Sequence, residues 1–163
     1  MKHNIELLKT DILNELDKLS LIRKELELFA EKLELGSELV PAYDRTAIGY
    51  FLHNFYNGCE NIFHSIANFF ENDLAPDTWH TDLLKRIKLT IPGFRPAVIN
   101  DDLYVLLNDF RGFRHIFRHS YIFELNWERE QAVAKQLEKT TKMLTQQTHA
   151  FLAQFDKLKG PTS

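Results

Sequence analysis

The chain has 163 residues, enough for one domain over residues 1–163 with a hydrophobic core, and 44% of them are hydrophobic, including 13 phenylalanines. Glycine and proline are sparse, which excludes a disordered chain, and the net charge of −3 excludes a generally basic nucleic-acid binder. The single cysteine excludes an internal disulfide. No apolar run approaches membrane-spanning length, so we expect a cytoplasmic protein that is not inserted in a membrane.

The first predicted element is one long helix from Ile5 to Leu33. Its apolar residues recur every three or four positions and Glu and Lys fill the gaps, which is typical of a bundle or coiled-coil seam. Gly36 and Ser37 end this helix, and Pro41 keeps the connection from becoming helical again. We expect this helix to serve packing and to take no direct part in chemistry.

A second helix is predicted after Asp44, which can cap its first turn, and it continues to Phe70. One edge of this helix carries an unusual set of polar residues: His53, Asn54, Asn57, Glu60, Asn61 and His64. His53 and His64 cannot share a metal ion, because eleven residues of helix separate them by about 16 Å. We therefore expect this edge to form hydrogen bonds with neighbouring helices or with a row of arginines later in the chain.

A short helix and a loop lead to the most informative part of the chain. The segment from Asn72 to Asp77 predicts a turn, and a short helix is expected from Thr78 to Leu89. A loop from Ile91 to Pro96 follows, and Asn100 and Asp101 cap the next helix.

This next helix combines a buried face with a row of cations. Its apolar residues recur at helical spacing: Leu103, Leu106, Leu107, Phe110, Phe113 and Phe117. Arg111, Arg114 and Arg118 lie three and four residues apart and form a cationic row off the apolar face. A row of guanidinium groups suits phosphate, and from His80 to Tyr121 the local charge is +3. We expect any contact with RNA to be local to this region.

An interruption is predicted between Ser120 and Asn126, and a last helix runs from Trp127 to Leu158. Four long helices and one short helix joined by modest loops predict an all-α fold, an antiparallel helical bundle.

The segment from Arg114 to Tyr121, with the pattern Arg-x4-His-x-Tyr, resembles the signature of HEPN-domain ribonucleases, specifically HepT toxins of HepT–MntA (type VII-like) toxin–antitoxin pairs. His115 fills the position after the arginine, where that family usually carries Asn, Asp or His. The resemblance extends roughly from Tyr43 to Trp127. It implies one HEPN-like domain, and a homodimer with the motif in a cleft between two protomers.

RNA cleavage without a metal needs a base for the 2′-hydroxyl, a cation for the charged phosphorane and an acid for the leaving oxygen. Histidine suits proton transfer near neutral pH, and arginine suits phosphate oxygens. We therefore predict His119 as general acid or base and Arg114 as phosphate clamp, with no metal and no other cofactor. The expected supporting and RNA-binding residues are Arg111, His115, Arg118, Glu60 and Asn61.

The roles of Glu60 and Asn61 in the second helix depend on the arginine that they meet. Both are candidates for orienting Arg114 or an arginine of a partner chain, and a plain salt bridge is the alternative interpretation. Five residues of ideal helix turn the side-chain direction by about 140°, so Arg114 and His119 diverge. Either the helix distorts before Ser120 or a second chain completes the site.

Tyr121 is the predicted modification site. In HepT-like toxins the matching tyrosine receives AMP from an MntA-like nucleotidyltransferase antitoxin, which silences the toxin. On a continuous helix Tyr121 lies about 20° off the direction of Arg114 and shares its face, so an attached phosphate would oppose RNA there.

Sequence leaves three functions open. The first is an endoribonuclease toxin that cleaves tRNA or mRNA and is silenced by AMP transfer. The second is a catalytically inactive HEPN substrate-binding or oligomerisation module that partners a nucleotidyltransferase, which the acidic surroundings favour. The third is an ordinary helical oligomerisation domain.

Overall fold

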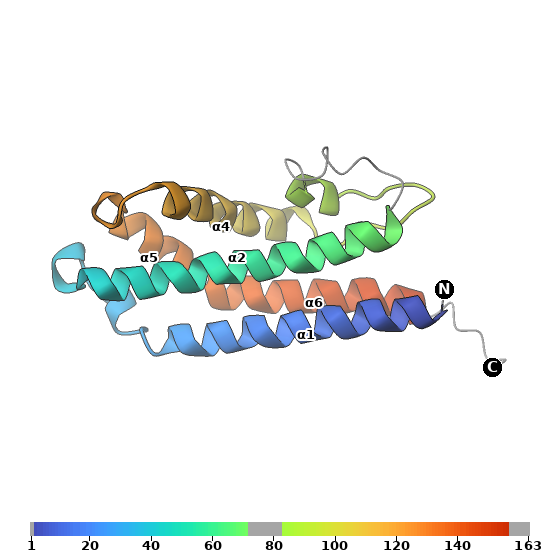
Figure 1. Ribbon diagram of the computed structural model, residues 1–163, viewed down its shortest axis with the longest axis horizontal. Helices are drawn as coiled ribbons and strands as arrows, with labels where there is room; N and C mark the ends of the chain where they lie inside the picture. Colours follow the sequence, from blue (N-terminus) through green and yellow to red (C-terminus); the bar gives the residue numbers. More distant parts are fainter. Residues whose placement is uncertain (1, 72–82, 157–163) are drawn as a thin grey trace.

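The chain folds into a bundle of α-helices, shown as a computed structural model in Figure 1. The structure describes residues 2–71 and 83–156. Within these ranges there is no β-strand, and residues 83–87 are helical in addition to the five helices named next. These helices are α1 (Lys2–Glu27), α2 (Ala42–Phe70), α4 (Asp101–His119), α5 (Trp127–Lys135) and α6 (Leu137–Asp156). The predicted all-α class is confirmed.

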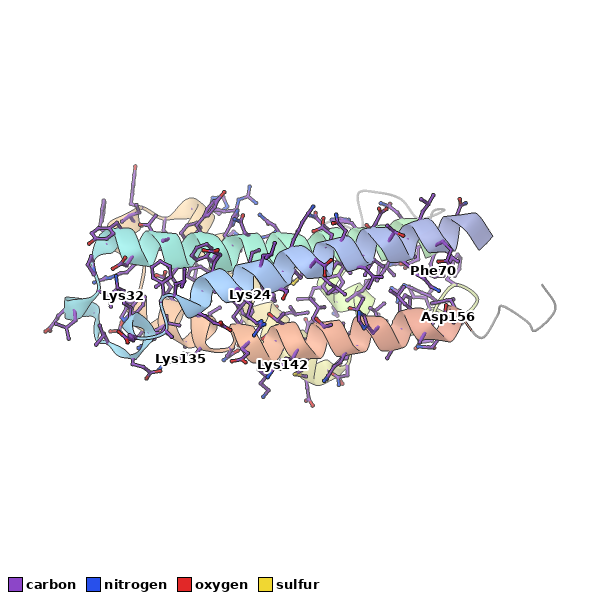
Figure 2. The ribbon with its side chains drawn as sticks, turned by 90° about the horizontal axis from the view of Figure 1, so that it is seen from below. Lys24, Lys32, Phe70, Lys135, Lys142 and Asp156 are labelled. Atoms are coloured by element: carbon purple, nitrogen blue, oxygen red, sulfur yellow. The ribbon has the colours of Figure 1, made fainter. Side chains whose placement is uncertain are left out.

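Helix α2 lies at the centre of the bundle, where it contacts α1, α4 and α5. Successive long helices run in opposite directions, as the colour gradient of Figure 1 shows. Phe70 at the end of α2 and Asp156 at the end of α6 lie at one end of the bundle, and Lys32 and Lys135 lie at the other (Figure 2). The antiparallel arrangement predicted for the long helices is therefore present.

One hydrophobic core joins the helices, and α2 contributes its apolar face to it. The ring centroids of Phe55 of α2 and Phe110 of α4 lie 4.9 Å apart, and both side chains are fully buried. Cys59 is a free, buried thiol within this core. None of the described helices is both long and apolar enough to span a membrane. The core fixes the position of α4, which carries the predicted motif.

Helix α1 ends six residues before the predicted boundary at Leu33, since its last residue is Glu27. From Leu28 to Ala30 the backbone N–H groups bond to the carbonyl three residues earlier, which tightens the chain into turns. Leu28 is 78% exposed, while the Phe29 ring turns inward to lie 5.9 Å from the Phe51 ring. Apolar spacing continued past the point at which the chain leaves the helix, so this predicted boundary was wrong.

Two further helix boundaries differ from the prediction. Pro41 occupies the position expected for Asp44 before α2, and Asp44 lies inside the first turn, buried and paired with Lys32. The last helix is divided at Gln136 into α5 and α6. The side chain of Trp127 donates a hydrogen bond of 2.9 Å to the carbonyl of Leu35, which ties α5 to the connection after α1. This contact joins residues that are far apart in the sequence, so the periodicity of apolar residues could not predict it.

Two predicted segments fall wholly or partly outside the described residues. The predicted turn at 72–77 and residues 78–82 of the predicted short helix are among them. Its later part is helical at residues 83–87. The predicted loop after it closes tightly, with a bridge between Ile91 and Arg95 and a left-handed backbone at Gly93, where φ is 82°. Glycine adopts that conformation without a steric penalty.

Candidate active site

The arginine and histidine of the predicted motif lie on the last two turns of α4, and its tyrosine follows the helix. The Asn100 side chain caps the helix by accepting a hydrogen bond of 2.9 Å from the N–H of Leu103, as predicted. Asp101 and Asp102 are in the first turn and Arg118 and His119 in the last, which matches the direction of the helix dipole. Ser120 has an extended backbone, so the helix ends at His119 and the predicted interruption is present.

An open cavity of about 550 Å³ lies over the motif. Its lining comes from α4 and from one residue of α5: Arg111, Gly112, Arg114, His115, Ile116, Arg118, His119 and Arg129. Four guanidinium groups and two imidazoles thus share one concave surface. Such a surface suits a ligand with several negative charges.

The Arg114 guanidinium lines the cavity and is held by residues of α2. Its Nη1 and Nη2 donate to the two carboxylate oxygens of Glu60 at 2.8 and 3.0 Å, and Nη1 also donates to Oδ1 of Asn57 at 2.8 Å. The group lies over the Tyr56 ring, 4.7 Å from its centroid. Glu60 therefore orients Arg114 and also compensates its charge.

Asn61, the other residue proposed to orient Arg114, does not take part in these contacts. It lies on an exposed turn of α2, and its backbone carbonyl accepts a hydrogen bond from Ser65. Asn57, one helical turn before Asn61, provides the amide that reaches the guanidinium. Sequence placed both residues on the same polar edge, but it could not distinguish which of them faces α4.

His53 extends this group of residues by one further turn of α2. The Asn57 amide oxygen accepts from Arg114, so its nitrogen faces Nε2 of His53 at 3.1 Å and donates to it. Burial lowers the pKa of His53, and the guanidinium groups of Arg114 and Arg118 lower it further. His53 is therefore neutral at pH 7, which is the state that this hydrogen bond requires.

The two predicted catalytic residues reach the same cavity from different directions. Helix α4 remains α-helical through His119, so the distortion considered before Ser120 does not occur between Arg114 and His119. His119 is exposed at the end of the helix, and its ring lies 4.8 Å from that of His115. Arg114 and His119 both line the cavity, although Arg114 is turned toward α2.

The other cavity arginines have no carboxylate partner among the described residues. Arg111 donates to the neutral side chain of Asn108 at 2.7 Å. Neither Arg118 nor Arg129 forms an ion pair within the described ranges. Sequence reasoning missed Arg129, because it lies on another helix and belongs to no motif. A cation in the first turn of a helix, where the dipole disfavours it, was the available signal.

A buried carboxyl group lies next to the cavity residue Arg129 in the sequence of α5. Glu130 follows Arg129 on α5, is fully buried, and accepts no hydrogen bond through either side-chain oxygen within the described structure. A Cβ atom at Gly49 would come within 2.6 Å of the Phe117 ring and 3.3 Å of Glu130 Oε1, so α2 approaches α4 and α5 closely there. Burial raises the pKa of Glu130 to about 8, against smaller opposing effects of nearby Arg45 and of the Gly49 backbone N–H.

Tyr121 lies beyond the end of α4, so the predicted shared helical face with Arg114 is wrong. Its backbone is extended, and its ring is 71% exposed and stacked on Phe123 at 5.4 Å with 5° between the ring planes. The hydroxyl is therefore accessible from solvent. Its position follows from the chain turn after His119 and does not depend on a helical repeat.

The family model described as HepT-like protein matches residues 47–155 of the chain, which is more than half of it. The matched range begins within α2 and ends within α6, so it contains the whole cavity and its supporting residues. No curated protein and no solved structure matches the chain. Within the described residues, no group of three or more His, Cys, Asp and Glu residues is arranged to hold a metal ion.

Proposed function

The chain belongs to the HepT-like protein family, and from this premise we propose that it is a HEPN-type endoribonuclease, the toxin of a HepT–MntA toxin–antitoxin pair. The proposed substrate is tRNA or mRNA. The observation that carries the proposal is the cationic cavity that Arg114 and His119 both line. An RNA strand brings to such a cavity the phosphate groups that its arginines can bind.

In the proposed reaction, His119 either accepts the proton of the 2′-hydroxyl as a base or donates a proton to the leaving 5′-oxygen as an acid. It is the exposed imidazole at the end of the helix, where a substrate can approach it. Arg114 uses three hydrogen bonds on Glu60 and Asn57, and a guanidinium has five N–H donors. Two donors remain for phosphate oxygens, and Glu60 holds them in a fixed direction. No metal ion enters this mechanism.

We further propose that an MntA-like nucleotidyltransferase silences the protein by transferring AMP from ATP to the Tyr121 hydroxyl, with release of pyrophosphate. The tyrosine is exposed and lies two residues after His119 in the chain. An attached phosphate would place negative charge close to the site at which the RNA phosphates should bind. This would reduce RNA binding through charge repulsion and through the bulk of the nucleotide.

One observation favours a second function. Glu60 compensates the charge of Arg114, the residue assigned to stabilise the charged transition state. A chain in which this ion pair persists with RNA bound would be a catalytically inactive module that binds a substrate for a partner nucleotidyltransferase. The two proposals differ in a single outcome, which is whether the bound RNA is cleaved.

The test is expression of the wild type beside Arg114→Ala and His119→Ala at equal protein levels, with growth and RNA integrity as readouts. Each substitution should lower the cleavage rate of the purified protein by about a hundredfold or more. Arg23→Ala on α1 and His149→Ala on α6 remove the same residue types outside the cavity and should cleave normally. Toxicity that survives both cavity substitutions would exclude the proposed site.

A further inference from the structure

The cavity holds more positive charge than the predicted motif explains, and the excess is not on Arg114. Glu60 accepts two hydrogen bonds from Arg114, so this pair adds little net charge. Arg118 and Arg129 have no ion-pair partner within the described part of the chain. A cationic surface without counter-charges attracts an anion from solution.

Arg129 reaches the cavity from a different helix. It belongs to the first turn of α5, whereas the other cavity arginines lie on α4. Its Nη2 atom lies over Gly112, where a Cβ atom would come within 3.1 Å of it. Glycine is among the least favourable residues inside a helix, and here its bare backbone leaves space for the guanidinium.

The place of Arg129 in α5 also runs against the helix dipole. The first turn of a helix carries partial positive charge, so a cation there lowers stability unless an anion compensates it. Asn126 caps the turn by accepting a hydrogen bond from the Arg129 backbone N–H, and the Arg129 side chain lines the cavity. Glu128 in the same turn is exposed and forms no ion pair with Arg129 within the described residues, so the guanidinium stays available to an anionic ligand.

We propose that Arg129 is a phosphate-binding residue of this site, and that Arg118 and Arg129 together hold phosphodiester groups of the RNA strand beside Arg114. The proposal rests on the proposed function for the identity of the ligand. The arginines then have two different roles. Arg114, whose guanidinium is fixed by Glu60, orients the bound phosphate, while Arg118 and Arg129 supply positive charge that no carboxylate of the described structure compensates.

The test is binding of a fluorescent single-stranded oligonucleotide whose 2′-hydroxyls are all methylated, so that it cannot be cleaved at these positions. Anisotropy titrations at several salt concentrations give both the affinity and its salt dependence. Arg129→Gln should weaken binding at least about tenfold, for every sequence tested. It should also reduce the slope of log affinity against log salt by about 0.7, as expected for one lost phosphate contact on a single strand.

Two variants control this experiment. Lys135→Gln removes one positive charge from the same helix outside the cavity, and should leave affinity and slope near wild type. Arg129→Lys keeps the charge and loses the fork of donors, so it should keep the salt slope and recover part of the affinity. Circular-dichroism melts of each variant establish that it is folded.

Each outcome separates this proposal from the proposed function. Wild-type binding that Arg129→Gln leaves unchanged, or failure of the folded wild type to bind the oligonucleotide, overturns the role of Arg129. Binding that depends on Arg129, together with a cleavable RNA that stays intact, supports the phosphate site and rejects the nuclease.

Discussion

At the scale of single residues, the molecule places a carboxyl group where ionisation is costly. Glu130 is fully buried where α2, α4 and α5 meet, close to the backbone of Gly49 and the Phe117 ring. Burial raises its pKa to about 8, so it is largely protonated at neutral pH. The adjacent Arg129 points to solvent and the cavity, so neighbouring residues of one helix turn have opposite environments.

We predict that Glu130→Gln changes the pH dependence of stability. Between the unfolded pKa of 4.5 and the folded value of about 8, the folded chain retains a proton that the unfolded chain has released. The free energy of unfolding of the wild type should therefore fall as pH rises through this window. Glutamine mimics the protonated acid, so the variant should gain roughly 2 kcal/mol or more over the wild type by pH 8 and little at pH 4.5.

Urea denaturation at pH 4.5 and pH 8 measures this difference. Glu128→Gln is the matched control, since Glu128 is an exposed carboxylate on the same turn of α5. Its effect on unfolding should be nearly independent of pH. Parallel stability curves for wild type and Glu130→Gln would show that this carboxyl group titrates normally in the folded protein.

At the scale of elements, the position at which α4 ends determines that the motif tyrosine, Tyr121, is exposed to solvent. The helix stops at His119 because Ser120 adopts an extended backbone, and the following residues form a short 3-10 turn, Ile122–Glu124. Tyr121 therefore leaves the helical repeat and stacks on Phe123 in solvent. A modifying enzyme can reach this tyrosine without opening the bundle.

We predict that Tyr121→Phe escapes silencing and retains cleavage activity. Phenylalanine keeps the stacked ring but lacks the oxygen that would receive AMP. After incubation with the nucleotidyltransferase and ATP, intact-mass spectrometry should detect an added AMP on the wild type and none on the variant. Tyr43→Phe, at a tyrosine that is 74% exposed at the start of α2, should be modified and silenced like the wild type. Continued silencing of Tyr121→Phe by the nucleotidyltransferase would contradict the assignment.

At the scale of the whole molecule, the arrangement of Arg114 and His119 favours a site shared between two chains. Arg114 is turned toward Glu60 on α2, and His119 is exposed at the helix end. Both residues line the cavity, but their side chains leave the helix in different directions. Five residues of α-helix rotate the side-chain direction by about 140°. A second copy that packs over the cavity would bring its own His119 toward Arg114.

We predict a homodimer whose active sites combine residues of both protomers. Sedimentation equilibrium should give twice the monomer mass at concentrations where the protein cleaves RNA. Mixing Arg114→Ala with His119→Ala should restore roughly a quarter of wild-type activity after subunit exchange, because mixed dimers then contain one intact composite site. A monomer at active concentrations, or no recovery on mixing, would place the site within a single chain.

Much of this protein could be predicted from local sequence. Apolar spacing of three and four residues identified the long helices, and Asn100 identified the start of α4, because both signals act over a few residues. The segment from Arg114 to Tyr121 led to the family for the same reason. Boundaries failed at Glu27 and Gln136, because the apolar spacing continues past the end of the helix there.

The remainder was decided by tertiary structure. Sequence placed Asn57, Glu60 and Asn61 on one polar edge, but only the packing of α2 against α4 selected the first two as partners of Arg114. No pattern in the chain joined Arg129 to the motif, because residues of separate helices become neighbours only when the bundle forms. Local periodicity determined which helices form and which faces are buried, whereas the ion pairs and the cavity depend on how those faces meet.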